Sequence, residues 1–105
     1  MTAPVKTRTR KAPKDRKAEV LEGAIAAAVK HGWATCTRQD VADAAGVSPA
    51  LVNHYLGDMA ATRRAVMREA VRRGLARIVA EGLVLRDKVA LKAPEELKAA
   101  ARQAL

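Results

Sequence analysis

The sequence predicts an all-α fold, and three observations support this prediction. Hydrophobic residues make up 50% of the 105 residues but aromatic residues only 2%, so alanine supplies much of the apolar fraction. Alanine together with Glu, Lys, Arg and Leu is the composition of helices. No segment alternates apolar and polar residues for long enough to form a strand, whereas apolar residues recur at helical spacing. The length fits one domain with a modest core.

Positive charge is concentrated at the N-terminus. The formal net charge is +9, and residues 1–17 carry seven Lys or Arg against one acid, Asp15. Residues 1–12 mix Pro, Thr, Lys and Arg without periodicity, which predicts a flexible basic arm. A field of this sign raises the encounter rate with polyanions, among which nucleic acid is the commonest. The arm therefore either contacts phosphates or the minor groove, or is a solvated tail without a specific role.

The sequence lacks the residues that several classes of function require. Cys36 is the single cysteine, so the chain cannot form an intramolecular disulfide, and a cysteine-based zinc site is not expected. This cysteine content fits a protein of the reducing cytoplasm. There is neither the apolar segment of a secretory signal nor a run of transmembrane length, so no membrane partner is predicted. The two histidines, His31 and His54, accompany no catalytic set, phosphate-cradling glycine loop or paired metal ligands. We therefore expect no enzymatic activity, no cofactor and no metal.

The first helix is expected to begin around Pro13–Asp15 and to end before Gly32, which supplies a helix stop. Lys30 and His31 stand in its last turn, where cations suit the helix dipole, so His31 is interpreted as a helix-end cation. Trp33 follows and is expected to cover the corner towards the next helix. The apolar stripe of this first helix consists of Leu21, Ala24, Ile25, Ala28 and Val29.

Two short helices with sharp ends are predicted next. Thr37 is an N-cap with an acid three residues later, which is a variant of the capping box. Gly46 ends this helix after about two turns. Ser48 and Pro49 begin the following helix, because serine is a good N-cap and proline suits the first helical position. This helix is expected to extend to about Leu56.

A long fourth helix is expected from Met59 to Glu81, with Asp58 as its cap and Gly82 as its end. Arginines away from its apolar stripe are by default a solvated face. The stripe itself consists of Met67, Val71, Leu75 and Ile78.

The C-terminal part gives a weaker pattern. Residues 83–91 are apolar, and their pattern does not determine which secondary structure they form. A short last helix opens at Pro94, which is followed by two acids that suit a helix N-terminus. We expect residues 82–105 to form a helical segment that serves dimerisation.

The spacing within residues 37–56 predicts a helix-turn-helix. Two short helices joined by a three-residue turn pack closely at about a right angle, which requires small and apolar residues at fixed positions. Ala42 must be small because the next helix approaches its backbone, and Gly46 takes a left-handed conformation that a Cβ would penalise. Cys36 stands where a hydrophobic staple is expected, so we interpret it as a buried packing residue. The apolar positions of the motif are filled by Val41, Ala45, Val47, Val52 and Leu56.

Placing Val52 and Leu56 inward fixes the opposite face of the second short helix. Asn53 can form two hydrogen bonds with adenine, and His54 can donate to a base or a phosphate. This face would enter the major groove of duplex DNA, and the alternative is an ordinary polar helix surface. The residues of the face are Ser48, Pro49, Ala50, Asn53 and His54, with Leu51 at the side. Apolar atoms among them can contact the thymine methyl group.

Phosphate contacts are expected at the N-terminus of the first short helix. Backbone N–H groups and the helix dipole there suit a phosphate, and the residues concerned are Thr37, Arg38 and Gln39. Arg38 is the best single candidate for anchoring the DNA backbone. Tyr55 has two equal interpretations, core packing of its ring or a phosphate contact through its hydroxyl.

Residues 16–72 resemble the DNA-binding domain of the TetR family of bacterial repressors. The resemblance rests on the first-helix stripe and on four segments: Gly32-Trp33, Thr37-Arg38-Gln39-Asp40-Val41-Ala42, Ala45-Gly46-Val47-Ser48 and Asn53-His54-Tyr55-Leu56. It implies a three-helix head followed by a long fourth helix, a dimer and a palindromic operator. The DNA contacts that it implies fall on Thr37, Arg38, Gln39, Pro49, Ala50, Leu51, Asn53, His54 and Tyr55.

The chain also departs from the family pattern. The family usually has Tyr where this chain has Asn53, so we expect different base contacts. It usually has Lys where this chain has Met59, so one phosphate anchor is absent. Arg63, Arg64 or the basic arm would have to compensate. Family members normally continue as a helical ligand-binding and dimerisation domain, whereas this sequence stops at Leu105, so no small-molecule inducer is expected.

These inferences predict a cytoplasmic protein that binds double-stranded DNA sequence-specifically. The expected organisation is a basic arm (1–12), a DNA-binding domain (13–81, with the motif at 37–56) and a C-terminal dimerisation segment (82–105). The first hypothesis is repression of transcription by a homodimer without a small-molecule inducer, with a co-repressor protein as an optional partner. The alternatives are an architectural or DNA-processing protein for partition or excision, and a protein-interaction adaptor.

Overall fold

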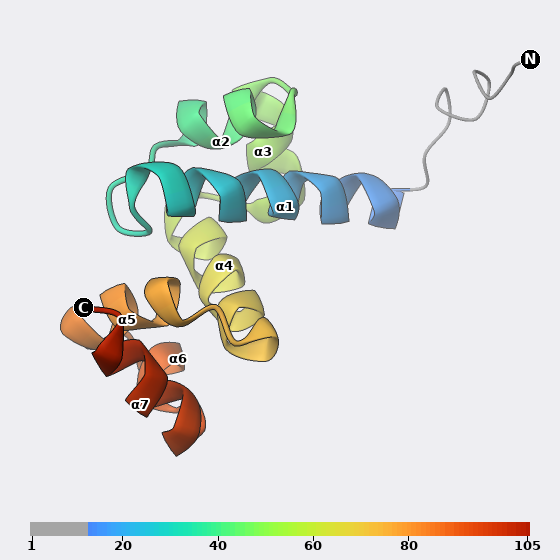
Figure 1. The fold of residues 1–105 in the computed structure, drawn as a ribbon. Coiled ribbons are helices and arrows are strands. Elements are labelled where there is room, and N and C mark those ends of the chain that lie inside the picture. Colours follow the sequence, from blue (N-terminus) through green and yellow to red (C-terminus); the bar gives the residue numbers. More distant parts are fainter. Residues whose placement is uncertain (1–12) are drawn as a thin grey trace, which may run out of the picture.

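The computed structural model describes residues 13–105, and within them every regular element is a helix (Figure 1). The all-α prediction is thereby confirmed, whereas the predicted arm at residues 1–12 lies outside the described residues. None of the helices in this range combines the length and the hydropathy that a membrane crossing requires. In chain order, the helices are α1 (Pro13–His31), α2 (Arg38–Ala45), α3 (Pro49–Leu56), α4 (Met59–Arg73), α5 (Ala76–Val84), α6 (Lys88–Leu91) and α7 (Glu95–Gln103).

Helix α1 forms the centre of the fold, with α2 and α3 on one side and α4 and α5 on the other (Figure 1). Its buried face includes Val20, Ala24 and Ala28, which recur every four residues as a helix stripe requires. The prediction that Val29 belongs to this stripe is wrong, because its side chain is 66% exposed. Val29 lies about 100° around the helix from Ala28 and therefore points away from the core.

Helices α1 and α2 approach each other at backbone distance. Gly23 is buried, and a Cβ atom added there would lie 2.5 Å from Ala45 Cβ and 2.7 Å from Ala45 Cα. A side chain at position 23 would therefore push the backbone of α2 away from α1. Ala42 on α2 is 1% exposed, as the predicted close packing of the short helices requires.

Local hydrogen bonds define where α2, α3 and α4 begin. Thr37 and Asp40 form the predicted capping box: Thr37 Oγ1 accepts from Asp40 N at 3.1 Å, and the Asp40 carboxylate accepts from Thr37 N at 2.9 Å. Ser48 and Asp58 cap α3 and α4 through their side-chain oxygens. Gly46 ends α2 with a left-handed φ of 71°. These predicted boundaries are confirmed, and each satisfies backbone groups that a helix end leaves free.

The prediction of one long helix from Met59 to Glu81 is wrong. Helix α4 ends just before Gly74, which adopts a left-handed φ of 72°, and Leu75 N donates to Ala70 O at 2.8 Å to close the helix. The chain then begins a separate helix, α5, which packs against α4, α6 and α7. The apolar stripe that looked continuous in the sequence is thus divided between two helices.

Gly82 also differs from the prediction, because it lies inside α5 rather than at a helix end. A Cβ atom added there would lie 2.5 Å from Met67 Cε and 2.7 Å from Ala90 Cβ. The glycine therefore permits the close packing of α5 against α4 and α6. The domain boundary predicted between residues 81 and 82 falls within α5, and the ambiguous residues 83–91 form the end of α5, a turn and α6.

A buried tryptophan joins the turn after α1 to the later helices. Trp33 is 6% exposed, which confirms it as a core residue. Its backbone N–H donates to both carboxylate oxygens of Glu81 on α5, at 2.8 and 2.9 Å. Its indole Nε1 donates to Arg63 O on α4 at 2.9 Å. This one residue therefore ties the N-terminal helices to both α4 and α5.

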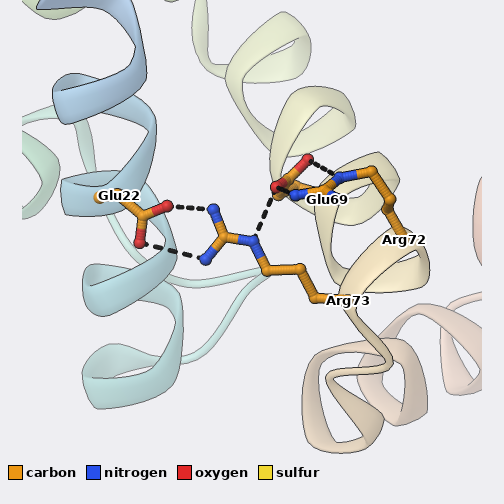
Figure 2. A network of polar contacts seen from close by, with 4 residues as sticks. All are labelled: Glu22, Glu69, Arg72 and Arg73. Carbon is orange, nitrogen blue, oxygen red and sulfur yellow. Dashed lines mark hydrogen bonds and ion pairs between the residues drawn. The ribbon is translucent and has the colours of Figure 1, made fainter. Parts of the chain in front are cut away.

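A second polar cluster joins α1 to the end of α4. Figure 2 shows Glu22 on α1 facing the guanidinium of Arg73, which also contacts Glu69 on its own helix. Arg72 pairs with the same Glu69 carboxylate. Two carboxylates and two guanidinium groups thus neutralise one another where α4 passes α1.

Candidate nucleic-acid interface

Helices α2 and α3 are joined by a three-residue turn at residues 46–48. Val47 N donates to Ala42 O at 3.0 Å, so the turn is fixed by a backbone hydrogen bond to the end of α2. Val52 is fully buried and Leu56 is 8% exposed, and both belong to the core as predicted. Because these two residues face inward, the opposite side of α3 is presented to solvent.

The outward face of α3 is small and polar. Ala50, Asn53 and His54 are exposed, and Pro49 and Leu51 at the start of the helix are half-buried. Residues three and four apart lie on one side of a helix, so positions 50, 53 and 54 form one surface. Helix α3 contains no Asp, Glu, Lys or Arg. The surface therefore offers hydrogen-bonding groups and methyl carbons, the chemistry that base edges recognise.

Two of the predicted contact residues have structural roles. Ser48 Oγ accepts from Leu51 N at 3.2 Å and so caps α3. Tyr55 is half-buried and packs against the core, and its ring makes an edge-to-face contact with the His54 ring at a centroid distance of 4.7 Å. The core-packing interpretation of Tyr55 is thus observed, and a phosphate contact by its hydroxyl stays a prediction.

The N-terminus of α2 is occupied by an acid of the chain itself. Asp40 accepts from Thr37 N, and this hydrogen bond, helped by the charges of His31 and Lys30, holds the pKa of the Asp40 carboxyl below its usual range. The Thr37 hydroxyl is committed to Asp40 N. A phosphate approaching this terminus therefore meets a negative charge, and its attraction must come from nearby cations rather than from the helix dipole alone.

Arg38 and Gln39 differ in their availability. Gln39 Nε2 donates to Asp43 Oδ1 at 2.8 Å, so this amide is engaged within α2. Arg38 is half-buried, and its Nε atom has no hydrogen-bond partner within residues 13–105. Because this Nε atom is buried, the predicted contact with the DNA backbone depends on the outer nitrogens of the Arg38 guanidinium.

Further positive charge lies on α1. This helix projects beyond α2 and α3 at its N-terminal end (Figure 1), where Lys14 and Lys17 are exposed. The predicted basic arm precedes this end in the sequence. The cations that a duplex would need therefore come from α1 and α2, whereas α3 supplies the uncharged face.

Cys36 lies beneath this region as a packing residue. It is 5% exposed, and its Sγ lies 3.7 Å from Trp33 O. Burial raises the pKa of the Cys36 thiol, which keeps it in its unreactive protonated form. Within residues 13–105, no group of three or more His, Cys, Asp or Glu side chains is arranged to hold a metal ion.

The sequence interpretation missed one gathering of basic side chains. Arg63, Arg64, Arg86 and Lys88 line an open cleft between α4 and α6. The first two are expected from the sequence to form a solvated face, and the other two fall in the ambiguous segment 83–91. Only the packing of α6 against α4 brings them together, so no local pattern could have shown it.

Comparisons with protein-family models, with curated proteins and with solved structures find no match for this chain.

Proposed function

We propose that this protein binds double-stranded DNA sequence-specifically through α3 and represses transcription at a palindromic operator as a homodimer. In this proposal α2 and α3 are a helix-turn-helix within a TetR-like head made of α1 to α4. The observation that carries it is the burial of Val52 and Leu56 opposite the exposed face of Ala50, Asn53 and His54 on the same short helix. Such a helix can enter the major groove while the core holds its angle.

Base recognition is assigned to the middle of α3. The side-chain N–H of Asn53 can donate to adenine N7 while its carbonyl oxygen accepts from the N6 amino group of the same adenine. Asn53 therefore favours an A·T pair at one position of the site. His54 can donate to a neighbouring base or phosphate, and the carbon atoms of Ala50 and Leu51 suit a thymine methyl group. Each good base contact is worth about 1–3 kcal/mol of discrimination.

Phosphate contacts position the helix. Arg38 at the start of α2 and the exposed Lys14 and Lys17 on α1 flank the groove-facing surface. Contacts of this kind carry no sequence information but fix the register of the protein on the duplex. They also make affinity fall steeply with salt, by about one unit of log–log slope for each phosphate neutralised.

The dimer is assigned to the C-terminal segment. Four of the five large apolar side chains that are exposed within residues 13–105 lie in residues 82–105, namely Val84, Leu85, Leu91 and Leu105. We expect Leu85→Asp to give a monomer with weakened operator affinity, and Val29→Asp, which changes an exposed apolar residue on α1, to leave the dimer intact. Sedimentation equilibrium checks both variants. A wild-type monomer that binds its operator fully would refute this assignment.

The central test is selection of bound sequences from random duplexes at stated salt. We expect an inverted repeat whose half-sites are about one helical turn, ~34–36 Å, apart. Binding without sequence preference at physiological salt would refute the proposal.

Variants then assign the contacts. The double substitution Asn53→Ala with His54→Ala should lower affinity for the selected site by about 100-fold and relax its sequence preference, because two base contacts are lost. Arg38→Gln should weaken binding to all sequences alike and reduce the salt slope by about one. Arg68→Gln, which changes an exposed arginine on α4, is the matched control and should bind as the wild type does.

A promoter reporter separates repression from the other uses of DNA binding. Repression through the selected site, lost in the Asn53→Ala and His54→Ala variant, supports the proposal. Footprinting of the site without any effect on the promoter would favour an architectural or DNA-processing role. Function that survives this double substitution would favour a protein-interaction adaptor.

A further inference from the structure

An open cleft of about 480 Å³ lies between α4, the turn that follows α1 and the segment joining α5 to α6. Its lining includes Trp33, Arg63, Arg64, Arg86, Asp87 and Lys88, which together define the basic cleft. None of its lining residues belongs to α2 or α3, so it is separate from the outward face of α3. Its volume is in the range of sites that hold small molecules.

Within residues 13–105, the basic cleft carries an excess of positive charge, because its lining has four cations and one carboxylate, Asp87. None of these four cations forms an ion pair within residues 13–105: Arg63, Arg64, Arg86 and Lys88. The one carboxylate of the lining, Asp87, accepts from two backbone N–H groups at the start of α6, at 3.0 and 3.1 Å. Glu81, the acid nearest to this segment on α5, is held by the backbone N–H of Trp33.

The opposite end of α4 provides an internal comparison. Arg72 and Arg73 are paired with Glu69 and Glu22 (Figure 2). The arginines at the end of α4 are thus paired with acids, whereas the four cations of the basic cleft share one carboxylate, Asp87, and none of them forms an ion pair with it. Uncompensated cations that converge on one cleft repel one another, and an anionic ligand removes this cost.

The backbone conformation of Arg86 supports a role for its side chain. Arg86 has a left-handed φ of 58°, and it is the only non-glycine residue in residues 13–105 with a positive φ. The other positions with positive φ are Gly32, Gly46, Gly57 and Gly74. A left-handed conformation is strained for a residue with a side chain, so glycine would be the unstrained choice here as well.

The walls of the basic cleft are held in place before any ligand binds. Trp33 Nε1 donates to Arg63 O at 2.9 Å, which fixes the turn after α1 against α4. The backbone N–H of Asp87 donates to Gly82 O at 2.8 Å, which fixes the segment that carries Arg86. A preorganised site loses less entropy when it binds an ion than a set of free surface side chains does.

We propose that the basic cleft binds a phosphate group, held by the guanidinium groups of Arg64 and Arg86 with Lys88 and Arg63 beside them. Arginine forks match the geometry of phosphate oxygens, and lysine adds a point charge. The phosphate belongs either to a small phosphorylated molecule or to the backbone of a bound duplex. The inference does not depend on sequence-specific binding by α3.

The test uses the full chain and two probes, inorganic pyrophosphate and a 20-base-pair duplex, in calorimetric titrations. Three variants are compared with the wild type: Arg64→Gln, Arg86→Gly and, as the matched control, Arg68→Gln. Arg68 is an exposed arginine on α4 outside the cleft. Arg86→Gly removes a charge and relieves the strained φ, so this variant is expected to unfold no more readily than the wild type, and loss of binding in it is not loss of folding.

We expect pyrophosphate to bind the wild type at one site, with affinity about tenfold lower in Arg64→Gln and in Arg86→Gly, because each loses a charge-assisted contact. Arg68→Gln should bind as the wild type does. If pyrophosphate does not bind but the two cleft variants alone weaken duplex binding and lower its salt slope, the phosphate is that of DNA. Equal effects of all three variants, or no effect of the cleft variants on either probe, would overturn the proposal. If the protein binds pyrophosphate in the cleft but does not bind the duplex, this inference is supported and the proposed function is refuted.

Discussion

The helices before and after Gly74 begin in different ways. Helices α2, α3 and α4 each start at a side-chain cap, supplied by Thr37, Ser48 and Asp58. Helices α5 and α7 start without a side-chain cap hydrogen bond, and after Gly74 only the four-residue α6 has one. The first region is therefore specified by residues close in sequence, and the second by what its helices pack against.

This difference bears on the proposed function. A helix that contacts bases must be held at a fixed angle, and α3 has a capped start, a hydrogen-bonded turn before it and two buried anchors, Val52 and Leu56. The C-terminal region instead exposes apolar side chains, such as Leu85 just after α5 and Leu105 after α7, which suits a surface completed by another chain.

The largest expected effect comes from filling the contact between α1 and α2. Gly23→Ala should lower the free energy of unfolding by about 2 kcal/mol, because overpacking costs about 1–3 kcal/mol and the gain in helix propensity returns less than about 1. Its Cβ would meet the backbone of Ala45, which cannot move alone. Gly82→Ala in α5 is the matched variant, and its Cβ meets the mobile end of Met67 as well as Ala90 Cβ.

Urea unfolding of both variants measures the comparison. Gly82→Ala should cost about 1–2 kcal/mol, less than Gly23→Ala, because the end of Met67 can shift and the helix gains propensity, although Ala90 Cβ moves only with the backbone of α6. A larger loss for Gly82→Ala than for Gly23→Ala would show that the C-terminal packing, and not the α1–α2 contact, is the less tolerant of the two.

The same contrast explains how much of the fold the sequence could predict. The starts of α2, α3 and α4 follow from Thr37, Ser48 and Asp58, because a cap acts through hydrogen bonds to residues two or three positions away. The sequence pattern places the end of the long helix at Gly82, whereas the structure places the end of α4 at Gly74 and Gly82 inside α5. A glycine that ends a helix and one that permits close packing inside a helix look alike in a sequence, and only the position of α6 beside α5 distinguishes them.

The next effect concerns the link between the two regions. Glu81→Ala should lower the free energy of unfolding by about 1–3 kcal/mol, because the backbone N–H of Trp33 loses a charged acceptor in a partly buried position. Glu81→Gln keeps one acceptor oxygen and should lose less than half as much. Thermal and urea unfolding check both variants, and equal losses for the two would show that packing by the side chain, not the hydrogen bond, is what matters.

The candidate interface was predictable to a similar extent. The outward face of Ala50, Asn53 and His54 follows from helical spacing once Val52 and Leu56 are placed inward. The environment of each side chain was not predictable, because it depends on rotamers and on neighbours from other turns. Thus the Gln39 amide is engaged by Asp43, and the basic cleft needs α4 and α6 together.

A smaller loss of stability, equal at the two positions, is expected when the glycines that end α2 and α4 are substituted. Gly46 and Gly74 have φ values of 71° and 72°, and a Cβ added at either would meet nothing within 4 Å. Alanine at either position should therefore cost about 1–2 kcal/mol from backbone strain alone, and asparagine less, because asparagine tolerates the left-handed region. Urea unfolding should give equal costs for the two positions. A cost at position 46 that is larger by more than about 1 kcal/mol would show that the turn before α3 carries additional strain.

The smallest effect comes from the ion pairs between α1 and α4. Hydrogen bonds from Arg72 and then Arg73 lower the pKa of Glu69 from 4.5 to about 2, and a hydrogen bond from Arg73 lowers the pKa of Glu22. Because each folded-state pKa lies below its unfolded value, the network stabilises the folded chain above about pH 4.5 and loses this contribution as the pH falls towards about 2.

Glu69→Gln isolates this contribution. At pH 7 the variant should be less stable than the wild type by about 1 kcal/mol at most, because pairs that face solvent are weak. Between about pH 5 and pH 2 the two stability curves should converge, since protonation removes the same charge that the substitution removes. Urea unfolding across this range provides the measurement. If the difference between the two proteins stays constant over the whole range, then Glu69 acts through its packing, and the ionic network contributes nothing to joining α4 to α1.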